Sequence, residues 1–402
     1  MTDAAPDRLL DDARALLPEI VAVRRRLHRA PEVGLNLPRT QRTVLDALGG
    51  LGLTVTTGDR LTSVTAVLEG ARPGPTVLLR GDMDALPQQE DTGLEFASEV
   101  PGAMHACGHD LHTAMLVGAA RLLAARRAEL AGRVLFMFQP AEETDGGARY
   151  MIEEGLLETP DGAGIVAAFA LHVTTRFESG TVRLRPGPTF AASDQIHLTV
   201  RGRSGHASAP HTALDPIPVA CEIVQALQTL ATRSVHVFDP AVITIASIHA
   251  GTTTNIIPET AELHGTFRTL TPETRRRVRE GVERVARHVA AAHGADVDVN
   301  LIEGYPPVVN DPEVAGTVRD TAAALLGADL VEELPEPFMG AEDFSYVLRR
   351  VPGVMAFLGA RRPGTSAEEA PDCHSNRVVF DEPALAAGAA LHAAVALRHL
   401  SR

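Results

Sequence analysis

Short apolar runs that alternate with helical patterns restrict the possible folds of this chain more than any other feature. Four such runs cover residues 76–79, 134–138, 167–171 and 354–358. Residues 8–29 and 111–130 instead carry apolar side chains at helical spacing. Strands that are apolar on both faces and separated by helices are typical of a mostly parallel sheet flanked by helices. The sequence therefore predicts an α/β fold for these parts of the chain.

The middle of the chain, residues 194–303, shows a different pattern. Ile196, Leu198 and Val200 alternate with polar residues, which predicts a half-exposed strand. The elements expected after it are a helix, two strands, a helix that begins at Thr271-Pro272 and a last alternating strand, at residues 214–231, 242–249, 260–268, 271–292 and 297–301. The order β-α-β-β-α-β is that of a ferredoxin-like sandwich. We therefore expect an α+β domain of residues 187–303, inserted into a discontinuous α/β domain of residues 1–186 and 304–402.

Composition disfavours several classes of function. The 402 residues include 37 basic and 51 acidic side chains, a net charge of −14, which argues against binding to nucleic-acid phosphates. No run reaches ~18 consecutive apolar residues, so no membrane-spanning helix is expected. Three cysteines cannot form a disulfide framework, and the acidic first residues are unlike a secretory signal. These features predict a cytoplasmic protein without nucleic-acid or membrane partners.

The densest group of reactive side chains is the segment His105-Ala106-Cys107-Gly108-His109-Asp110-Leu111-His112. A thiolate and an imidazole two residues apart can reach one metal ion or two adjacent ones. Gly108 permits a bend, and the helix expected after it would lower the pKa of the Cys107 thiol. In the alternative interpretation, Cys107 is only a small buried hydrophobic residue and the histidines lie on the surface.

Further candidates follow the predicted strands, where α/β sheets place their functional crevice. Asp82 and Asp84 follow the first run, Glu142-Glu143 the second, and His172 closes the third. Adjacent glutamates are more often a solvated turn, but their place after a buried strand favours a site. His374, after the last run, is the candidate that spacing supports least.

At this point the chain resembles the M20 metallopeptidases and amidohydrolases. The resemblance is closest to the branch of N-acyl amino acid amidohydrolases, hippurate hydrolase and the plant auxin-conjugate amidohydrolases. It runs from Gly81-Asp82-Met83-Asp84-Ala85-Leu86-Pro87 to His374, and His105-Ala106-Cys107-Gly108-His109-Asp110 is specific to the branch, because most other members have Asp in place of Cys. Other matching motifs are Gln139-Pro140-Ala141-Glu142-Glu143, Gly205-His206-Ala207, Gly251…Asn255-Ile256-Ile257-Pro258 and Gly340-Ala341-Glu342-Asp343-Phe344.

The resemblance implies a zinc-peptidase-like domain with an inserted ferredoxin-like lid. Because such an insert has exposed sheet edges that pairing would cover, we expect the lid to join subunits into a homodimer or a higher homo-oligomer. The resemblance also implies two divalent ions per subunit, zinc or manganese, with cobalt or nickel as alternatives. The implied ligands are a bridging Cys107 and the terminal residues His109, Glu143, His172 and His374. Glu142 would be the general base and Asp84 would orient a ligating histidine, while Asp82 receives no role.

The inserted domain would supply the remaining site residues. His206 resembles a histidine that reaches into the partner subunit's active site, and Asn255 and Arg268 resemble residues that hold the substrate's carboxylate and carbonyl. For Arg268 the alternative is an ordinary surface arginine on a strand. The expected reaction is hydrolysis of N-acyl-L-amino acids to a carboxylic acid and a free amino acid. A dipeptidase or aminopeptidase of the same clan, a non-catalytic metal-binding protein and a redox thiol protein are the alternatives.

Overall fold

The computed structural model describes residues 5–159, 162 and 164–401, and the chain divides into two compact units. The first unit consists of Met1–Gly187, Val309–Pro335 and Tyr346–Arg402, and the second of Pro188–Val308 and Glu336–Ser345. The chain passes between them through β7 (Gly187–Phe190) and β14 (Val308–Asn310), and again before and within α8 (Ser345–Leu348). The predicted boundaries lay at 186/187 and 303/304. The structure also assigns to the second unit the segment at 336–345, whose Phe338 exchanges backbone hydrogen bonds with Thr189 and Ala191.

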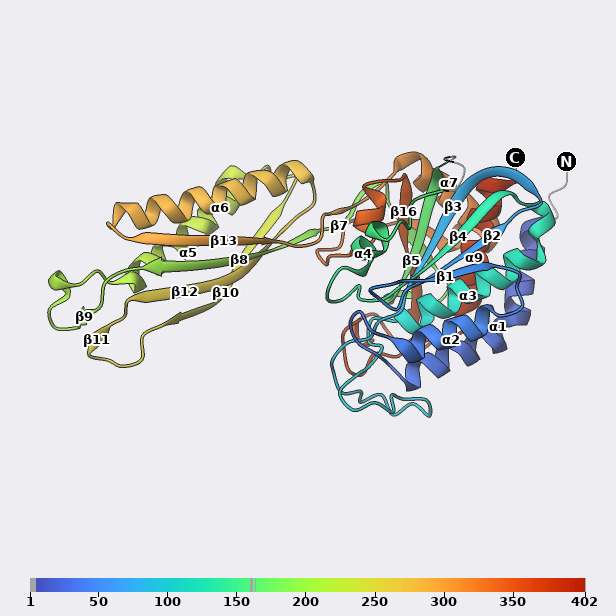
Figure 1. Cartoon of the computed structure of the whole chain (residues 1–402), viewed down its shortest axis with the longest axis horizontal. Helices are drawn as coiled ribbons and strands as arrows, with labels where there is room; N and C mark the ends of the chain where they lie inside the picture. The colour runs from blue at the N-terminus through green and yellow to red at the C-terminus, as the bar shows by residue number, and fades with distance from the viewer. Residues whose placement is uncertain (1–4, 160–161, 163, 402) are drawn as a thin grey trace. The chain divides into compact units, whose positions relative to one another are not determined.

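The first unit contains an eight-stranded sheet flanked by helices (Figure 1). In spatial order its strands are β1 (Thr54–Thr57), β2 (Val64–Glu69), β4 (Ala131–Gln139), β3 (Arg72–Asp82), β5 (Ile165–Glu178), β16 (Gly353–Arg361), β6 (Val182–Leu184) and β15 (Val331–Glu333). The central strands β4, β3, β5 and β16 are parallel, as predicted. The hairpin of β1 and β2 pairs antiparallel with β4, which the sequence did not predict.

The helices of the first unit enclose a large apolar core. They are α1 (Ala5–Arg29), α2 (Pro38–Leu48), α3 (His109–Ala125), η1 (Arg127–Glu129), α4 (Gly147–Glu153), α7 (Pro312–Leu326), η3 (Ala328–Leu330) and α9 (Ala384–Leu400). The helices α3 and α9 are apolar around almost their whole circumference, because they pack against each other and against the central strands. This packing places the start of α3 against the end of β3 and beside Val173 of β5.

The second unit is an antiparallel sheet with two helices. Its strands lie in the order β10 (Ala241–Ala250), β12 (Thr260–Thr269), β8 (Ala192–Arg201) and β13 (Asp296–Glu303), and α5 (Pro216–Ser234) and α6 (Pro272–Ala292) pack against them (Figure 1). Thr271 caps α6 by accepting a hydrogen bond from the Thr274 N–H, so the helix begins where its sequence predicts. The elements follow one another along the chain in the β-α-β-β-α-β order.

Two smaller features of the second unit were not expected from the sequence. A two-stranded ribbon of β9 (Gly205–His206) and β11 (Ile256–Ile257) extends beyond the sheet, and η2 (Pro210–Thr212) follows β9 in the chain.

Among the residues that the structure describes, no helix has both the length and the apolar character required to span a membrane.

Candidate metal centre

The predicted ligands of the first unit gather at the carboxyl ends of the central parallel strands. Asp84 follows β3, Glu142 and Glu143 follow β4, and His374 lies in the loop after β16. His172 lies inside β5 rather than at its end, because that strand continues to Glu178. Cys107, just before α3, and His109, its first residue, lie at the same edge.

Two groups of three possible ligands share the Cys107 thiol. One joins Cys107 to His109 and His172, and the other joins it to Glu143 and His374, with the ligand atoms of each group within 4.8 Å of one another. The Cys107 Sγ lies 3.5 Å from the His172 Nε2. The His374 Nε2 lies 3.1 Å from the Glu143 Oε1. A thiolate common to two sets of nitrogen and oxygen donors suits two adjacent divalent ions.

Gly108 permits the sharp turn between the thiol and the helix. It caps α3 with a φ of +85°, and a Cβ at this position would lie 2.3 Å from the Val173 Cγ2. Both the backbone conformation and the lack of space therefore require glycine. The bend expected at this position is present, and it places Cys107 and His109 in the same group.

Asp84 organises the loop after β4. Its two carboxylate oxygens accept hydrogen bonds from the backbone N–H groups of Glu142 and Glu143, each at 3.0 Å. Its Oδ1 also lies 3.3 Å from the His109 Nδ1. One carboxylate thus orients both glutamates and the histidine ring, and Ala141, before them, has a φ of +56°.

The surroundings of His109 fit a bound cation. Its Nε2 is buried without a hydrogen-bond partner, 3.5 Å from the Asp82 Oδ2 and 3.8 Å from the Glu143 Oε1. Burial opposes a charge on this ring, but Asp82, Asp84 and Glu143 outweigh burial and raise its pKa to about 10. A pocket that retains a proton so strongly is electronegative, and a divalent ion can replace that proton.

The electrostatics of Cys107 differ from the prediction. The sequence predicts a thiol pKa lowered by the helix N-terminus, whereas the structure shows a pKa raised well above its ordinary value. A hydrogen bond with Cys373, burial and the carboxylate of Glu143 are the main causes. In the sequence Cys373 adjoins His374, which made it a candidate to compete as a soft metal ligand. Its position beside Cys107 depends on the loop after β16. A divalent ion would favour the thiolate, because a coordinating thiol loses its proton.

Asp82 and His112 are the buried neighbours that the sequence left without a role. The Asp82 carboxylate lies 2.7 Å from the Arg80 Nη1 and 2.6 Å from the His112 Nδ1. Burial acts to raise the pKa of Asp82, but Arg80 and the neighbouring histidines hold it well below its usual range. Burial lowers the pKa of His112 to about 4, so its ring is neutral near pH 7. The i, i+3 spacing of His109 and His112 places both rings on one face of the helix, and this spacing could have indicated that His112 lies beside the metal ligands.

The candidates of the second unit lie in two separate places. His206 is in β9 and pairs with Ile256, and the Asn255 carbonyl accepts a hydrogen bond from the Ala207 N–H at 3.1 Å. Arg268 is near the far end of β12, eight residues beyond Thr260. At about 3.4 Å per residue this separation is ~27 Å along the strand. Arg268 is half-buried, and its Nη1 has no hydrogen-bond partner.

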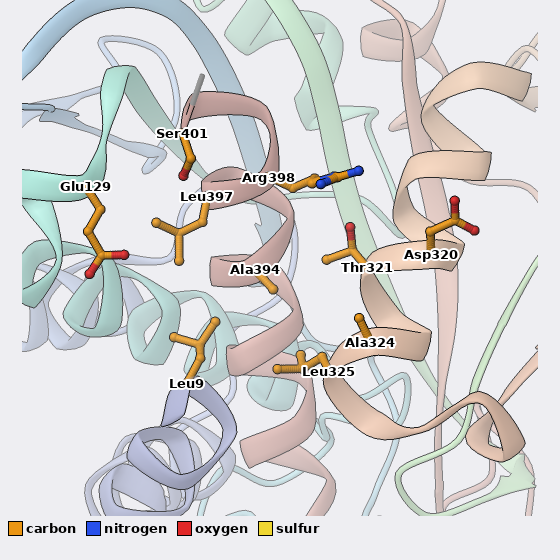
Figure 2. A pocket seen from close by; sticks show the side chains of 10 residues that line it. All are labelled: Leu9, Glu129, Asp320, Thr321, Ala324, Leu325, Ala394, Leu397, Arg398 and Ser401. Atoms are coloured by element: carbon orange, nitrogen blue, oxygen red, sulfur yellow. The ribbon is translucent and has the colours of Figure 1, made fainter. Parts of the chain in front are cut away.

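The first unit also contains a cavity of about 460 Å³ away from these groups (Figure 2). It lies between α1, α7 and α9 and is lined by Leu9, Glu129, Asp320, Thr321, Ala324, Leu325, Ala394, Leu397, Arg398 and Ser401. None of the predicted ligands or catalytic residues lines it. Its volume alone therefore does not make it the active site.

Comparisons with known proteins identify the family. The model of peptidase family M20/M25/M40 matches residues 78–398, which include every predicted ligand. Thermostable carboxypeptidase 1 of Saccharolobus solfataricus is 38% identical over 400 residues, covering 98% of both chains. The N-acetyl-L-cysteine deacetylase of Bacillus subtilis is 38% identical, over 91% of this chain and 85% of the relative.

A plant relative and a solved structure extend the comparison. The IAA-amino acid hydrolase ILR1-like 4 of Arabidopsis thaliana is 37% identical, over 95% of this chain and 86% of the relative. The crystal structure of Bacillus subtilis YXEP protein, described as a dinuclear metal-binding peptidase, matches with a TM-score of 0.83 and 34% identity, over 96% and 98% of the two chains. The chain belongs to peptidase family M20/M25/M40, and it is a metal-dependent amidohydrolase or peptidase.

Proposed function

We propose that this enzyme hydrolyses the amide bond of N-acyl-L-amino acids and releases a carboxylic acid and a free amino acid. The observation that carries the proposal is the pair of ligand groups sharing Cys107, beside the buried carboxylate of Glu142. Relatives named N-acetyl-L-cysteine deacetylase and IAA-amino acid hydrolase support an acylated amino acid as the substrate.

The proposed ligands are Cys107, His109, Glu143, His172 and His374, with Cys107 bridging. Two divalent ions held there would acidify a water molecule toward pKa ~7 and polarise the amide carbonyl. The mixed sulfur, nitrogen and oxygen donors suit zinc, and manganese, cobalt or nickel are the alternatives.

Glu142 would act as the general base. Its backbone N–H is held by Asp84, and its side chain is buried within reach of the His109 and Glu143 ligand atoms. The carboxylate accepts a proton from the attacking water as the C–O bond forms. It then donates that proton to the amine nitrogen as the C–N bond breaks, so the acid and the free amino acid leave with all atoms accounted for.

His206 would stabilise the oxyanion of the tetrahedral intermediate. The Ser208 N–H lies 3.1 Å from the His206 Nδ1, and a backbone N–H can only donate. In the neutral ring the proton is therefore on Nε2, which is exposed and available to donate to an oxyanion. Asn255 directly precedes β11, and its Oδ1 accepts a hydrogen bond from the Thr253 hydroxyl at 3.0 Å, which leaves its amide nitrogen as a donor.

Arg268 would bind the substrate's α-carboxylate. Burial lowers its pKa, opposed by Asp194, but Asp194 already forms a bidentate pair with Arg275 at 2.7 and 2.8 Å. Because the Arg268 guanidinium is partly desolvated and its Nη1 has no hydrogen-bond partner, a carboxylate would be a favourable ligand for it.

The separation within the second unit supports a homodimer. Arg268 lies ~27 Å along β12 from Thr260, and the ribbon that carries His206 lies beyond the Thr260 end of that strand (Figure 1). One small amide does not extend so far. For both to contact the same substrate, one of them must come from a partner subunit. We therefore propose that the second unit supplies the dimer contact and that His206 acts in the partner's active site. The cytoplasmic location stays a prediction.

A panel of substrates tests the proposed function. N-acetyl, N-benzoyl and long-chain N-acyl amino acids are compared with unblocked dipeptides on the metal-loaded enzyme, with Glu142→Gln as the background. Cleavage of blocked substrates that disappears in the variant supports the proposal. Cleavage of dipeptides alone would favour the dipeptidase or aminopeptidase alternative. A relative named carboxypeptidase makes dipeptides a necessary part of the panel.

A further inference from the structure

His112 makes two hydrogen bonds that fix its tautomer. Its Nε2 accepts a hydrogen bond from the Val173 N–H at 2.8 Å, and its Nδ1 lies 2.6 Å from the Asp82 Oδ1. Because a backbone N–H cannot accept, the ring proton must be on Nδ1 and is donated to Asp82. Both nitrogens are therefore occupied, although His112 belongs to a group with Asp82 and His109 that resembles a metal site. The ring has no lone pair left for an ion.

Asp82, which orients His112, is itself held through both its carboxylate and its backbone carbonyl. The Asp82 Oδ2 pairs with the Arg80 Nη1 at 2.7 Å, and the Arg80 Nε donates to the Gln139 side chain at 2.9 Å. The Thr113 hydroxyl donates to the Asp82 carbonyl at 2.7 Å. These contacts join the ends of β3 and β4 to the first turn of α3. Asp82 is thus a fixed anion inside the first unit.

The peptide held by His112 carries a proposed ligand. The His172 Nδ1 donates to the Val173 carbonyl at 2.8 Å, and this bond leaves its Nε2 facing the Cys107 Sγ. The pairing of β3 with β5 ends at Arg80 and Ala170, so the Val173 N–H lies beyond the last pair of that ladder. The His112 ring supplies the acceptor that β3 no longer provides. His112 and His172 are in contact, with ring centroids 5.0 Å apart.

We propose that His112 is a positioning residue of the metal centre, which holds the Val173 peptide and through it sets the direction of the His172 imidazole. The inference rests on the proposed function, because it assumes that His172 is a ligand. The connection runs from Arg80 through Asp82 and His112 to the backbone of β5. This chain of contacts explains the role of His112, which binds no ion itself, beside the proposed ligand His109.

The test compares two substitutions that each keep one half of the ring's hydrogen bonding. His112→Asn keeps a donor near the Nδ1 position and leaves the buried Val173 N–H without an acceptor. His112→Gln keeps an acceptor near the Nε2 position. The matched control is His392→Gln, which removes another buried neutral histidine, one that packs on Phe169.

Metal binding is the primary measurement. Each apoenzyme is titrated with Co²⁺ against a competing chelator while the visible d–d bands are recorded, and the unfolding temperature of each apoenzyme is measured. We expect His112→Asn to weaken one of the two metal equivalents about 10–100-fold with altered d–d bands. The other equivalent remains tight, His112→Gln binds closer to wild type, and His392→Gln binds as wild type.

The outcomes separate the inference from the proposed function. A wild-type enzyme that binds fewer than two equivalents would overturn the two-metal proposal itself. If wild type binds two equivalents and both His112 variants bind them equally well with unchanged bands, the positioning role is wrong. The same selective loss of one equivalent in His392→Gln would also overturn it, because any buried histidine would then have the same effect. Should His112→Asn fail to fold, His112→Leu, which also lacks an acceptor for the Val173 N–H, takes its place. Two equivalents bound as in wild type with unchanged bands would then refute the proposal, and one weakened equivalent would support it.

Discussion

The proposed site residues of the two units are held in very different ways. In the first unit Cys107 and His109 are buried, and Asp84 accepts two backbone hydrogen bonds from the loop after β4. In the second unit His206 lies in the two-residue strand β9 and Asn255 directly before β11, and both are exposed. Their side chains form hydrogen bonds with the nearby Ser208 and Thr253. Ligands of a cation require fixed positions before the ion arrives. Residues that meet a substrate must instead remain accessible. The comparison therefore fits the proposed division between metal binding in the first unit and substrate contact in the second.

The largest expected effect comes from the base of the first unit. Glu142→Gln should lower kcat ~10²–10⁴-fold or more, because the amide cannot accept the proton of the attacking water. Its metal content and unfolding temperature should match wild type. The adjacent substitution Glu143→Gln is the control, since it removes a proposed ligand and should reduce metal content as well. Turnover assays and elemental analysis of the two variants measure this contrast, and a fully active Glu142→Gln enzyme would contradict the base assignment.

A smaller loss is expected from the ribbon of the second unit. His206→Ala should lower kcat ~10²–10³-fold, the typical cost of one oxyanion donor, without loss of metal. His211→Ala, in the same exposed segment, should have no such effect.

Mixed dimers test whether His206 acts in the partner's site. After subunit exchange between His206→Ala and Glu142→Gln, half of the dimers are mixed and each has one complete site, so about one quarter of wild-type activity should return. If exchange is verified by mass and no activity appears, His206 does not act across the interface. A monomer by light scattering at micromolar concentration would lead to the same conclusion.

The smallest expected change concerns substrate selectivity. Arg268→Ala should lower kcat/KM about 10–100-fold for substrates with a free α-carboxylate, because a charge-assisted hydrogen bond is lost. The corresponding carboxamide substrates should be unaffected. Arg201→Ala is the control, since Arg201 is also a strand arginine of the same sheet but already pairs with Asp298. An unchanged ratio of acid to amide turnover would leave Arg268 as a structural residue.

Much of the fold could be predicted because its signals are local. The apolar runs at β3, β4, β5 and β16 became the central parallel strands, and Thr271-Pro272 begins α6. The hairpin of β1 and β2 was missed because β1 is fully exposed and carries no apolar alternation. The ribbon of β9 and β11 was missed because strands of two residues have no periodicity.

The sequence predicted more about the arrangement of the candidate site in the first unit than in the second. In the first unit, motifs after strands predicted residues that the structure brings into two groups of three, with the ligand atoms of each group within 4.8 Å of one another. The predicted direction of the Cys107 pKa shift was wrong, because Cys373 approaches the thiol from a loop more than 260 positions away in the chain. In the second unit, sequence placed His206, Asn255 and Arg268 in one domain but did not indicate that β12 separates the first two from the third.

The sequence by itself determined which side chains are available and where strands and helices lie, because residue type and hydrophobic period are local properties. The Cys107-Gly108-His109 turn is such a property, since only glycine tolerates its backbone angle and the contact with Val173. Tertiary structure alone decided that His112 bonds both to Asp82 and to the Val173 N–H. It also decided that four nitrogen and oxygen donors form two groups that share one thiol. Those relations depend on how β3, β5 and α3 pack, and packing brings together residues whose separation along the chain carries no signal of their contact.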